Sequence, residues 1–417
     1  MPGKIYFIDV TNRDGVQTAR LSLSKLQKTM INLYLNEFGV FQSEFGFPTT
    51  SHETNYLRAN LELARMGVLK PIRLSGWLRA TEEDVKKAFR MVPELEYLNI
   101  SLSTSDHMIQ GKFNGRKTRT DILEQMVRAA RAARQAGIKG LGVNAEDASR
   151  TDIKFLIDFA LAAREAGAER FRYCDTLGYD DPFTIYKTVS QLAEVISMPV
   201  EIHCHGDLGM AVANSIAGAK AVVDAGQDVY INTTVNGIGE RAGNADLVSC
   251  VLAVSKSKGM AGKYQFGRPI VLNRAYKLAK YASYAFNVPI PINMPGMGAN
   301  AFAHASGIHA DGVLKDPENY ELYSYEELGR GEPELVETGR LICSGEYSGI
   351  SGFSHIMGKM KVTFANAEEA HKILELVRYA NVEAQEPLVE DELLFIAKYP
   401  EITRRLLTLT PLADNAA

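Results

Sequence analysis

Residues 140–175 read GLGVNAEDASRTDIKFLIDFALAAREAGAERFRYCD and contain one full repeat of the chain's main pattern. A short β-rich run, GLGVN, leads into a charged patch. A long helical pattern follows, and a second β-rich run, RFRYCD, closes the stretch. A strand, a helix and a second strand in this order predict a right-handed βαβ unit with parallel strands. The stretch therefore indicates an α/β fold.

The same alternation runs from the N-terminus to about residue 280. Helical patterns separate eight strand candidates, which are residues 4–10, 40–45, 71–76, 97–102, 140–144, 170–175, 199–204 and 229–235. Eight βα units of this length predict a TIM (β/α)8 barrel. An open, doubly wound parallel sheet is the alternative that the pattern leaves.

The pattern changes beyond residue 285. A stretch rich in proline and glycine, NVPIPINMPGMGANAF, indicates an irregular linker, and about the last 60 residues are helical and charged. We expect a TIM-barrel domain over residues 1–285, a linker or lid over 286–340, and a small, mainly helical C-terminal subdomain over 341–417. Because only a short segment follows the linker, feedback control through a large regulatory domain is not expected.

Composition excludes several classes of protein. The net charge of −4 argues against a nucleic-acid partner, whose binding surface is usually basic. No apolar run reaches the roughly 18 residues of a membrane helix, and the N-terminus lacks the layout of a signal peptide. The four cysteines are scattered, without a CxxC motif. A reduced protein in the cytoplasm is therefore expected.

Polar patches follow seven of the eight strand candidates. They are DVTNRDGVQ, EFGFP, STSDHM, NAEDASR, CDTLGYD, HCHGD and NGIGERAGN. In a TIM barrel, the carboxyl ends of all strands meet at one face, where active sites lie. The patches therefore predict an active site on that face.

Residues 203–209, HCHGDLG, contain two histidines at the end of a strand candidate. Alternate residues of a strand point the same way, so His203 and His205 project together. They could share a metal ion or simply close a strand. Asp14, on the same rim, would complete a three-ligand site with room for water and substrate. Asn236 could ligate weakly or hold a metal-bound water.

Several of these motifs together resemble the DRE-TIM metallolyases. The matching stretches are RDGVQ, EFGFP, EDASR, DTLG, HCHGDLGMAVANS and GIGERAGNA. More narrowly, the chain is similar to the Claisen-condensing branch of isopropylmalate, citramalate, homocitrate and Re-citrate synthases. The later stretch SGIHADGVLKDPENYE resembles the linker motif of that branch, which lyases without the C-terminal region lack.

The resemblance implies roles for residues of the barrel. Asp14, His203 and His205 would bind a divalent metal ion (Mn²⁺, Mg²⁺, Co²⁺ or Zn²⁺), and mixed N/O ligation does not choose among them. Arg13 would polarise the keto oxygen of a 2-oxo acid, unless it forms a salt bridge to a neighbouring carboxylate. The remaining roles fall to four residues: Gln17 and Glu44 would order substrate and water, Thr176 would bind the substrate carboxylate, and Glu146 would order the catalytic group.

The resemblance also assigns proton removal from acetyl-CoA to the linker. His309 and Tyr320 match the residues that do this work in the family. The family's linker reaches over the barrel of a partner subunit, which implies a homodimer with exchanged linkers. A surface histidine in a loop is the alternative for His309, whereas His304 has the better claim to a structural role.

Residues 237–244, GIGERAGN, form a glycine-rich segment after the last strand candidate. Glycines at this place allow backbone N–H groups to approach a ligand closely. The resemblance makes the segment part of the acetyl-CoA site, and a tight βα turn is the alternative. The residues expected to bind CoA are Asn236, Gly237, Gly239, Arg241, Gly243 and Asn244.

The sequence also bears on which 2-oxo acid is used. Lysine-pathway homocitrate synthases carry an arginine for the distal carboxylate at the position that Gly142 holds here. QSEFGFP and LSGWLRA resemble Re-citrate synthases instead. Arg73 and Arg79 are candidates to pair with a second substrate carboxylate, and His107 is either a further ligand or structural. Gly206 replaces the family's common asparagine, a change expected to open the site.

These observations predict a metal-dependent Claisen condensation of acetyl-CoA with a dicarboxylic 2-oxo acid, followed by thioester hydrolysis. Oxaloacetate giving citrate is favoured, and 2-oxoglutarate giving homocitrate is the nearest alternative, ahead of isopropylmalate or citramalate synthesis. A cleaving lyase or aldolase of the same superfamily and a non-catalytic binding barrel are the other classes considered.

Overall fold

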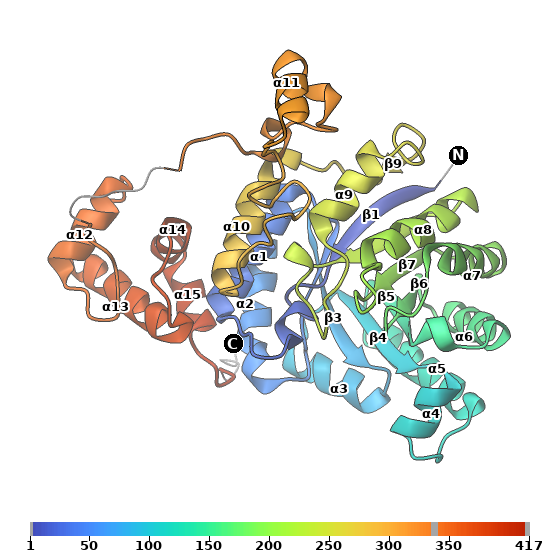
Figure 1. Ribbon diagram of the computed structural model, residues 1–417. Helices are drawn as coiled ribbons and strands as arrows, with labels where there is room; N and C mark the ends of the chain where they lie inside the picture. Colours follow the sequence, from blue (N-terminus) through green and yellow to red (C-terminus); the bar gives the residue numbers. More distant parts are fainter. Residues whose placement is uncertain (1–2, 335–340, 413–417) are drawn as a thin grey trace.

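Eight parallel strands close into a barrel (Figure 1) in the computed structural model, which describes residues 3–334 and 341–412. Neighbouring strands pair in chain order, and β1 pairs with both β2 and β8, which closes the ring. The strands are β1 Lys4–Asp9, β2 Gln42–Gly46, β3 Arg73–Arg79, β4 Tyr97–Ser103, β5 Gly140–Glu146, β6 Arg170–Asp175, β7 Val200–Cys204 and β8 Val229–Thr233. The TIM barrel is confirmed, and the open sheet is excluded.

Helices follow the strands and surround the barrel. The helices of the barrel domain are α1 Lys25–Phe38, α2 Thr54–Arg65, α3 Glu82–Met91, α4 Asp106–Lys112, α5 Arg119–Gln135, α6 Ile153–Glu165, α7 Pro182–Ile196, α8 Ala211–Asp224, α9 Leu247–Lys256 and α10 Ala275–Ala285. A two-residue strand, β9 Gln265–Phe266, pairs in parallel with the start of β1. Beyond the barrel lie α11 Gly307–Lys315, α12 Ile350–Lys359, α13 Ala367–Ala384, α14 Glu390–Lys398 and α15 Pro400–Leu406.

The helix boundaries follow local sequence chemistry. Ser24 caps α1 and forms a reciprocal capping box with Gln27, and Gly39 ends the helix with φ of 100°. Thr118 and Asp121 form the same box at the start of α5. The buried residues of α5 recur at helical spacing and pack it against the barrel, as the periodicity predicts.

One strand lies later in the chain than the sequence indicates. Residues 71–76 were the expected third strand, whereas β3 spans Arg73–Arg79. Its first residue is therefore at the amino-terminal mouth of the barrel, and its last residue is at the carboxyl-terminal rim. This shift of a few residues decides which side chains of β3 can reach an active site.

The barrel interior holds charged side chains. Glu44, Arg170, Arg172 and Glu201 point inward from β2, β6 and β7, and none is more than 3% exposed. TIM-barrel interiors are usually filled with branched apolar residues. Buried charges are tolerated only where they are paired and hydrogen-bonded. The interior of this barrel is therefore an ion-pair network.

The segment after α10 leaves the barrel and returns to it. Met294, Met297 and Leu328 are buried on the barrel side. Arg330 donates through NH1 to the carbonyl oxygens of Gly296 at 2.8 Å and Gly298 at 3.0 Å. The chain between these points carries α11, which stands out from the body (Figure 1).

Helices α12–α15 form a helical lobe (Figure 1, red), part of which packs against the outside of the barrel at α1 and α2. Asn55 of α2 donates to the carbonyl oxygen of Thr410 at 2.8 Å, and Arg405 pairs with Glu62.

The sequence predicts a linker over residues 286–340 and a C-terminal subdomain over residues 341–417. The division of the chain into these separate units stays a prediction. Residues 1–2, 335–340 and 413–417 of the expected domains lie outside the described residues. Over residues 3–334 and 341–412, no helix has the length and apolar character that crossing a membrane requires.

Candidate active site

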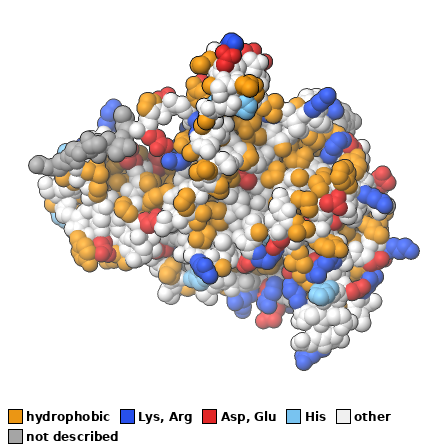
Figure 2. Space-filling view, in the orientation of Figure 1, with side chains coloured by type: hydrophobic (Ala, Val, Ile, Leu, Met, Phe, Trp, Pro, Cys, Tyr) orange, Lys and Arg blue, Asp and Glu red, His pale blue; other side chains and the backbone are white. Residues whose placement is uncertain are grey.

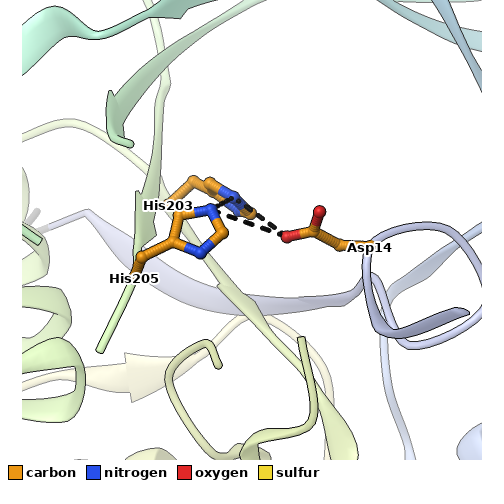
Figure 3. A group of neighbouring side chains, drawn as sticks. All are labelled: Asp14, His203 and His205. Carbon is orange, nitrogen blue, oxygen red and sulfur yellow. Dashed lines mark hydrogen bonds and ion pairs between the residues drawn. The ribbon is translucent and has the colours of Figure 1, made fainter. Parts of the chain in front are cut away.

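Asp14, His203 and His205 converge at the carboxyl-terminal face of the barrel (Figure 3). Asp14 follows β1, and the two histidines come from the end of β7. Asp14 Oδ2 lies 3.5 Å from Nε2 of His203 and 3.7 Å from Nε2 of His205, and the two Nε2 atoms are 3.2 Å apart. One carboxylate and two imidazoles on one side leave further positions open, as in catalytic metal sites.

The charges of these three side chains suit a cation. Burial lowers the pKa of His203, and burial together with the neighbouring His203 lowers the pKa of His205 to about 3, so both rings are neutral and carry a free lone pair. Burial opposes ionisation of Asp14, but the Arg13 guanidinium and hydrogen bonding to His203 hold its pKa well below the usual range. The donor set of one carboxylate and two neutral imidazoles therefore fits a divalent metal ion.

The glycine-rich segment after β8 packs directly on the triad. Asn244 is 7% exposed and donates from Nδ2 to Asp14 Oδ2 at 2.9 Å. Gly237 and Gly243 have φ of 68° and 87°, which L side chains rarely adopt. A Cβ at Gly239 would lie 1.7 Å from Asn244 Oδ1. The glycines thus allow this segment to bring Asn244 onto a metal-ligand candidate.

Gly206 lies against the same segment. Its N–H donates to the carbonyl oxygen of Gly243 at 2.9 Å, and a Cβ would lie 2.9 Å from the carbonyl oxygen of Ala242. The expectation that glycine here opens the site is therefore wrong. The space that a side chain would take is filled by the backbone of residues 242–243.

Arg13 bridges the triad and the charged interior. It donates from NH1 to Asp14 Oδ1 and from Nε to Glu44 Oε2, both at 2.9 Å. Its guanidinium also lies over the Trp77 ring, 5.4 Å from the centroid. The salt bridge considered as an alternative for Arg13 exists. It fixes the guanidinium beside the metal-ligand candidates, where Arg13 also borders the cavity.

A cavity of about 200 Å³ opens beside the triad. Its lining comes from seven strands or the loops after them: Arg13, Asp14, Gln17, Trp77, Ser101, Asn144, Glu146, Arg172, Cys174, Thr176, His203, His205, Glu240 and Arg241. Gln17, Glu146 and Thr176 are therefore where the sequence places them. Glu44 is fully buried and is not part of the lining, but its carboxylate accepts from the lining residues Arg13 and Arg172.

Glu146 has a partner that the sequence did not indicate. Lys112 of α4 donates to both of its carboxylate oxygens, at 2.6 and 2.7 Å, and Ser103 Oγ donates to Oε2 at 2.5 Å. The Lys112 side chain is 48% exposed, so this ion pair faces solvent. The carboxylate at the end of β5 is thereby held at the rim by two residues of the preceding unit, β4 and α4.

Thr176 is held between two neighbouring loops. Its hydroxyl accepts from the Asp147 N–H at 2.8 Å, and its carbonyl oxygen accepts from Arg241. Arg241 also forms a two-point ion pair with Asp207, through Nε at 2.9 Å and NH2 at 3.0 Å. The loops after β5, β6, β7 and β8 are thus connected around the cavity.

Arg73 and Arg79 do not reach the cavity. Arg73 starts β3 at the opposite mouth of the barrel, where its guanidinium stacks between the rings of Phe41 and Tyr97, at 4.6 and 5.0 Å. Arg79 ends β3, but its side chain is 74% exposed and forms a two-point pair with Asp84, at 2.8 and 2.9 Å. We therefore do not retain either arginine as a ligand for the second carboxylate.

Two further expected residues lie away from the cavity. His107 is exposed on α4 and is absent from the cavity lining within the described residues. Asn236, with φ of 58°, donates from Nδ2 to the carbonyl oxygen of Ala279 at 2.9 Å. Its amide thus fixes the turn after β8 to α10. It does not point toward a metal ion.

His309 and Tyr320 are brought together, but not with the barrel site of the same chain. Their rings stack with centroids 4.2 Å apart on the projecting segment that carries α11. A Cβ at Gly312 would lie 2.5 Å from the Tyr320 ring, so glycine there lets the ring pack on the helix. His304 instead pairs with Glu321 at 3.0 Å.

The projecting segment exposes apolar side chains (Figure 2). Ile308 is 75% exposed, Leu314 88% and Leu322 71%. Large exposed apolar side chains gathered on one element mark an interaction surface. This property accords with a linker that contacts another subunit.

Six residues of the cavity lining were not predicted from the sequence. These are Trp77, Ser101, Asn144, Arg172, Cys174 and Glu240. Arg172 had the strongest available signal, since Arg170 and Arg172 stand two apart within a strand of a parallel sheet, RFRYCD. Strands of that kind are buried on both faces, so charged residues within them need a special explanation.

Two family matches cover most of the chain. Residues 4–279 match the HMGL-like family, and residues 297–383 match the homocitrate synthase post-HMGL domain-like family. The first match coincides with the barrel. The second contains the projecting segment and the start of the helical lobe.

Several curated relatives match along nearly the whole chain. Citrate (Re)-synthase of Dehalococcoides mccartyi (strain CBDB1) is 68% identical over 414 residues, which are 99% of this chain and 100% of that protein. 2-Isopropylmalate synthase 2 of Caldanaerobacter subterraneus subsp. tengcongensis is 36% identical, over 94% of each chain. Homocitrate synthase 1 of Nostoc sp. is 35% identical, over 95% of this chain and 97% of its own.

Solved structures show the same barrel. Hydroxymethylglutaryl-CoA lyase from Pseudomonas aeruginosa matches with a TM-score of 0.55 at 16% identity, over 70% of this chain and 95% of its own. The HMG-CoA lyase from Brucella melitensis matches with a TM-score of 0.54 at 16% identity, over 68% and 100%. With the relatives above, the chain belongs to the HMGL-like family and, within it, to the Claisen-condensing branch of the DRE-TIM metallolyases.

Proposed function

We propose that this enzyme condenses acetyl-CoA with oxaloacetate and hydrolyses the resulting thioester, giving citrate by Re-face addition. The observation that carries the proposal is the 68% identity, over 99% of the chain, to a citrate (Re)-synthase. The site supports it, because the candidate metal ligands, an arginine and a carboxylate, Glu146, meet at one small cavity.

Asp14, His203 and His205 would hold the divalent cation. When bound, such an ion supplies Lewis acidity to an adjacent carbonyl oxygen. Mn²⁺, Mg²⁺, Co²⁺ and Zn²⁺ are all candidates for this ion, since the donor set suits all four. Asn244 and Arg13 orient the Asp14 carboxylate by donating to its two oxygens.

Arg13 would stabilise the charge that develops on the keto oxygen. Its guanidinium is held in place by Asp14, Glu44 and Trp77. A donor fixed in advance in a dry site stabilises a developing alkoxide without reorganisation. Gln17 and Thr176, which also line the cavity, would orient the substrate carboxylate and water.

His309 and Tyr320 of a partner subunit would remove the proton from the acetyl methyl group, and Glu146 would order this group. The stacked pair stands on an exposed segment, away from the cavity of its own chain. Gly237, Gly239, Arg241 and Gly243 would border the acetyl-CoA site at the rim. We propose a homodimer in which each linker completes the site of the other subunit.

We place the enzyme in the cytoplasm. The four cysteines, Cys174, Cys204, Cys250 and Cys343, are free, which suits a reducing compartment. Light scattering at working concentration tests the dimer: a mass twice that of the chain is expected, and a monomer would contradict the exchanged linker.

The first experiment measures CoA release from acetyl-CoA with oxaloacetate, 2-oxoglutarate, pyruvate or 2-oxoisovalerate. Each acid is tested with Mn²⁺, Mg²⁺, Co²⁺ or Zn²⁺ and with a chelator. We expect release with oxaloacetate that the chelator abolishes. A preference for 2-oxoglutarate would make the enzyme a homocitrate synthase, and release with none of the acids would refute condensation.

Deuterium-labelled acetyl-CoA and stereospecific cleavage of the product then test the Re face. Cleavage of citryl-CoA or another hydroxyacyl-CoA without condensing activity would favour the lyase alternative instead. The post-HMGL match over residues 297–383 argues against that alternative, since that segment accompanies the condensing branch.

A further inference from the structure

Arg172 is the most deeply buried cation that borders the cavity. Its side chain is 1% exposed and enters from the middle of β6, next to Glu201 of β7 in the register. Nε donates to Glu201 Oε2 at 2.6 Å and NH2 donates to Glu44 Oε1 at 2.5 Å. Among the described residues, NH1 has no hydrogen-bond partner. A buried guanidinium donor without a partner in a ligand cavity is a costly arrangement that a ligand can relieve.

The place of Arg172 fits the far end of a small ligand. Cys174, two residues later in β6, pairs in register with the metal-ligand candidate His203. Arg172 is therefore one inward-facing layer deeper than the metal-ligand candidates and forms part of the cavity floor. A ligand whose keto group meets the triad would point its other end at Arg172.

Arg13 and Arg172 share one carboxylate. Arg13 donates to Glu44 Oε2 and Arg172 donates to Glu44 Oε1. The two guanidinium groups are thus separated by a single carboxyl group, one near the triad and one at the floor. This spacing suits a short diacid, whose two carboxylates are a few bonds apart.

The buried ion-pair network around Arg172 compensates a bound divalent cation only when an anion is added. Arg13, Arg170 and Arg172 face Asp14, Glu44 and Glu201, so these six buried side chains sum to no net charge. A divalent cation on the triad adds two positive charges. A dianionic ligand restores neutrality, whereas a monoanionic 2-oxo acid leaves one buried positive charge uncompensated.

We propose that Arg172 binds the distal carboxylate of the 2-oxo acid through NH1, and so makes the enzyme selective for a short dicarboxylate. The inference rests on the proposed condensation and names the residue that selects its substrate class. Arg172 takes the role that we expected of Arg73 and Arg79 from the sequence analysis. An aliphatic substrate would leave NH1 unpaired and would place a methyl group against a buried charge.

The closest neighbour of Arg172 supplies a matched control. Arg170, two residues earlier in β6, donates to Glu201 Oε1 at 2.7 Å and to Gln42 Oε1 at 2.9 Å. It is 3% exposed, yet it is absent from the cavity lining within the described residues. Replacing Arg170 disturbs the same ion-pair network without touching the proposed ligand position.

The experiment compares wild type with Arg172→Lys, Arg172→Gln and Arg170→Gln. Circular dichroism and melting curves establish folding, and Arg172→Lys keeps the network charged should Arg172→Gln fail to fold. KM and kcat are measured by CoA release with oxaloacetate and with pyruvate. The Arg172 variants lose a hydrogen bond to the charged distal carboxylate. We therefore expect their KM for oxaloacetate to be about 10- to 100-fold higher than that of the wild type.

The ratio of kcat/KM for oxaloacetate to that for pyruvate should fall in both Arg172 variants and stay near wild type in Arg170→Gln. An unchanged ratio in Arg172→Lys, or an equal loss in Arg170→Gln, would overturn the inference and leave condensation standing. Wild-type activity confined to monocarboxylic acids would overturn it as well.

Calorimetric binding of oxaloacetate in the absence of acetyl-CoA separates the two proposals. Should no acid support CoA release, condensation fails. Oxaloacetate binding that weakens in Arg172→Lys and not in Arg170→Gln would then still support the inference. Binding of equal strength in wild type and Arg172→Lys would overturn it.

Discussion

Asn244 donates a hydrogen bond of 2.9 Å from its side-chain amide to Asp14 Oδ2. The first residue follows the last strand of the barrel and the second follows the first strand, so the bond forms across the point where the barrel closes. Arg13 donates to the other oxygen of Asp14, Oδ1, at 2.9 Å. Both carboxylate oxygens therefore have a fixed donor, and the orientation of Asp14 is set before a ligand binds.

Asn244→Ala should weaken binding of a divalent cation by about 10- to 100-fold, the usual cost of losing a partner that orients a metal ligand. Isothermal titration with Mn²⁺ measures the affinity directly. Asn236→Gly is the control, because the Asn236 amide binds Ala279 of α10 and glycine tolerates its φ of 58°. Equal losses in the two variants would show that Asn244 acts only on the stability of the loop.

Gly239→Ala should reproduce the effect of Asn244→Ala. A Cβ at this position would lie 1.7 Å from Asn244 Oδ1, so the amide must leave Asp14. Because both changes act on one hydrogen bond, the double variant should bind Mn²⁺ about as weakly as either single variant. Gly259→Ala is the control, since open space surrounds Gly259. Additive losses in the double variant would contradict this account.

Asp9 should make the stability of the protein fall as pH rises from about 4 to 7. Burial, with smaller effects from Asp246 and Glu44, raises the pKa of Asp9 to about 7, against the two hydrogen bonds from Thr11. The folded state therefore holds a proton that the unfolded state releases near pH 4, and this stability is lost as pH passes through 7.

Urea unfolding of wild type and Asp9→Asn at pH 5 and pH 8 checks this prediction. Asp180, whose pKa burial also raises to about 7, is present in both proteins and cancels in the comparison. The free energy of unfolding of Asp9→Asn relative to wild type should be higher at pH 8 than at pH 5, by about 1–3 kcal/mol. A difference independent of pH would show that Asp9 does not titrate in this range.

Mixing two inactive variants should restore activity if the linker completes the site of a partner. Arg13→Ala removes the barrel function and His309→Ala removes the linker function. In a mixed dimer, one of the two sites keeps both residues, so equal mixing with subunit exchange should recover about a quarter of wild-type CoA release. Arg13→Ala mixed with His203→Ala is the control and should stay inactive, because both changes fall in the barrel. If the mixture of Arg13→Ala and His309→Ala recovers no activity, His309 belongs to the site of its own chain.

The barrel could be predicted because its signal is repeated. Each βα unit shows a short apolar run followed by helical periodicity, and eight units close only in a few ways. The triad could be predicted for a related reason. His203 and His205 stand two apart at a strand end, and any residue just after β1 lies on the same rim, so small errors in strand position do not separate them.

Arg73 and Arg79, the residues predicted to bind the second carboxylate, could not be placed correctly from the sequence. The expected third strand, 71–76, put Arg79 beyond the strand, and β3 instead spans Arg73–Arg79. A shift of two or three residues moves a side chain to another layer or to the outside, because alternate residues face opposite ways. Arg172 was visible in the sequence, but its inward orientation and free NH1 depend on Glu44 and Glu201, which are distant in the chain.

The proposed role of His309 concerns more than one chain. Its sequence motif resembles the family's linker, and the structure shows its ring stacked on Tyr320. In the proposed homodimer, the way in which the two subunits meet decides which cavity the pair serves, and no pattern within one chain contains that information. The exposed Ile308 and Leu314 show only that some surface is needed to cover them.

Arg330 closes the excursion that carries α11, through its bonds to Gly296 and Gly298. The two ends of the excursion are thereby fastened to each other, so α11 is presented on a closed loop and not on a free arm. The entropic cost of closing that loop is part of the folding free energy of the monomer. In the proposed homodimer, association would join surfaces that are already organised, and the length of the loop would set the reach of His309 before the partner subunit binds.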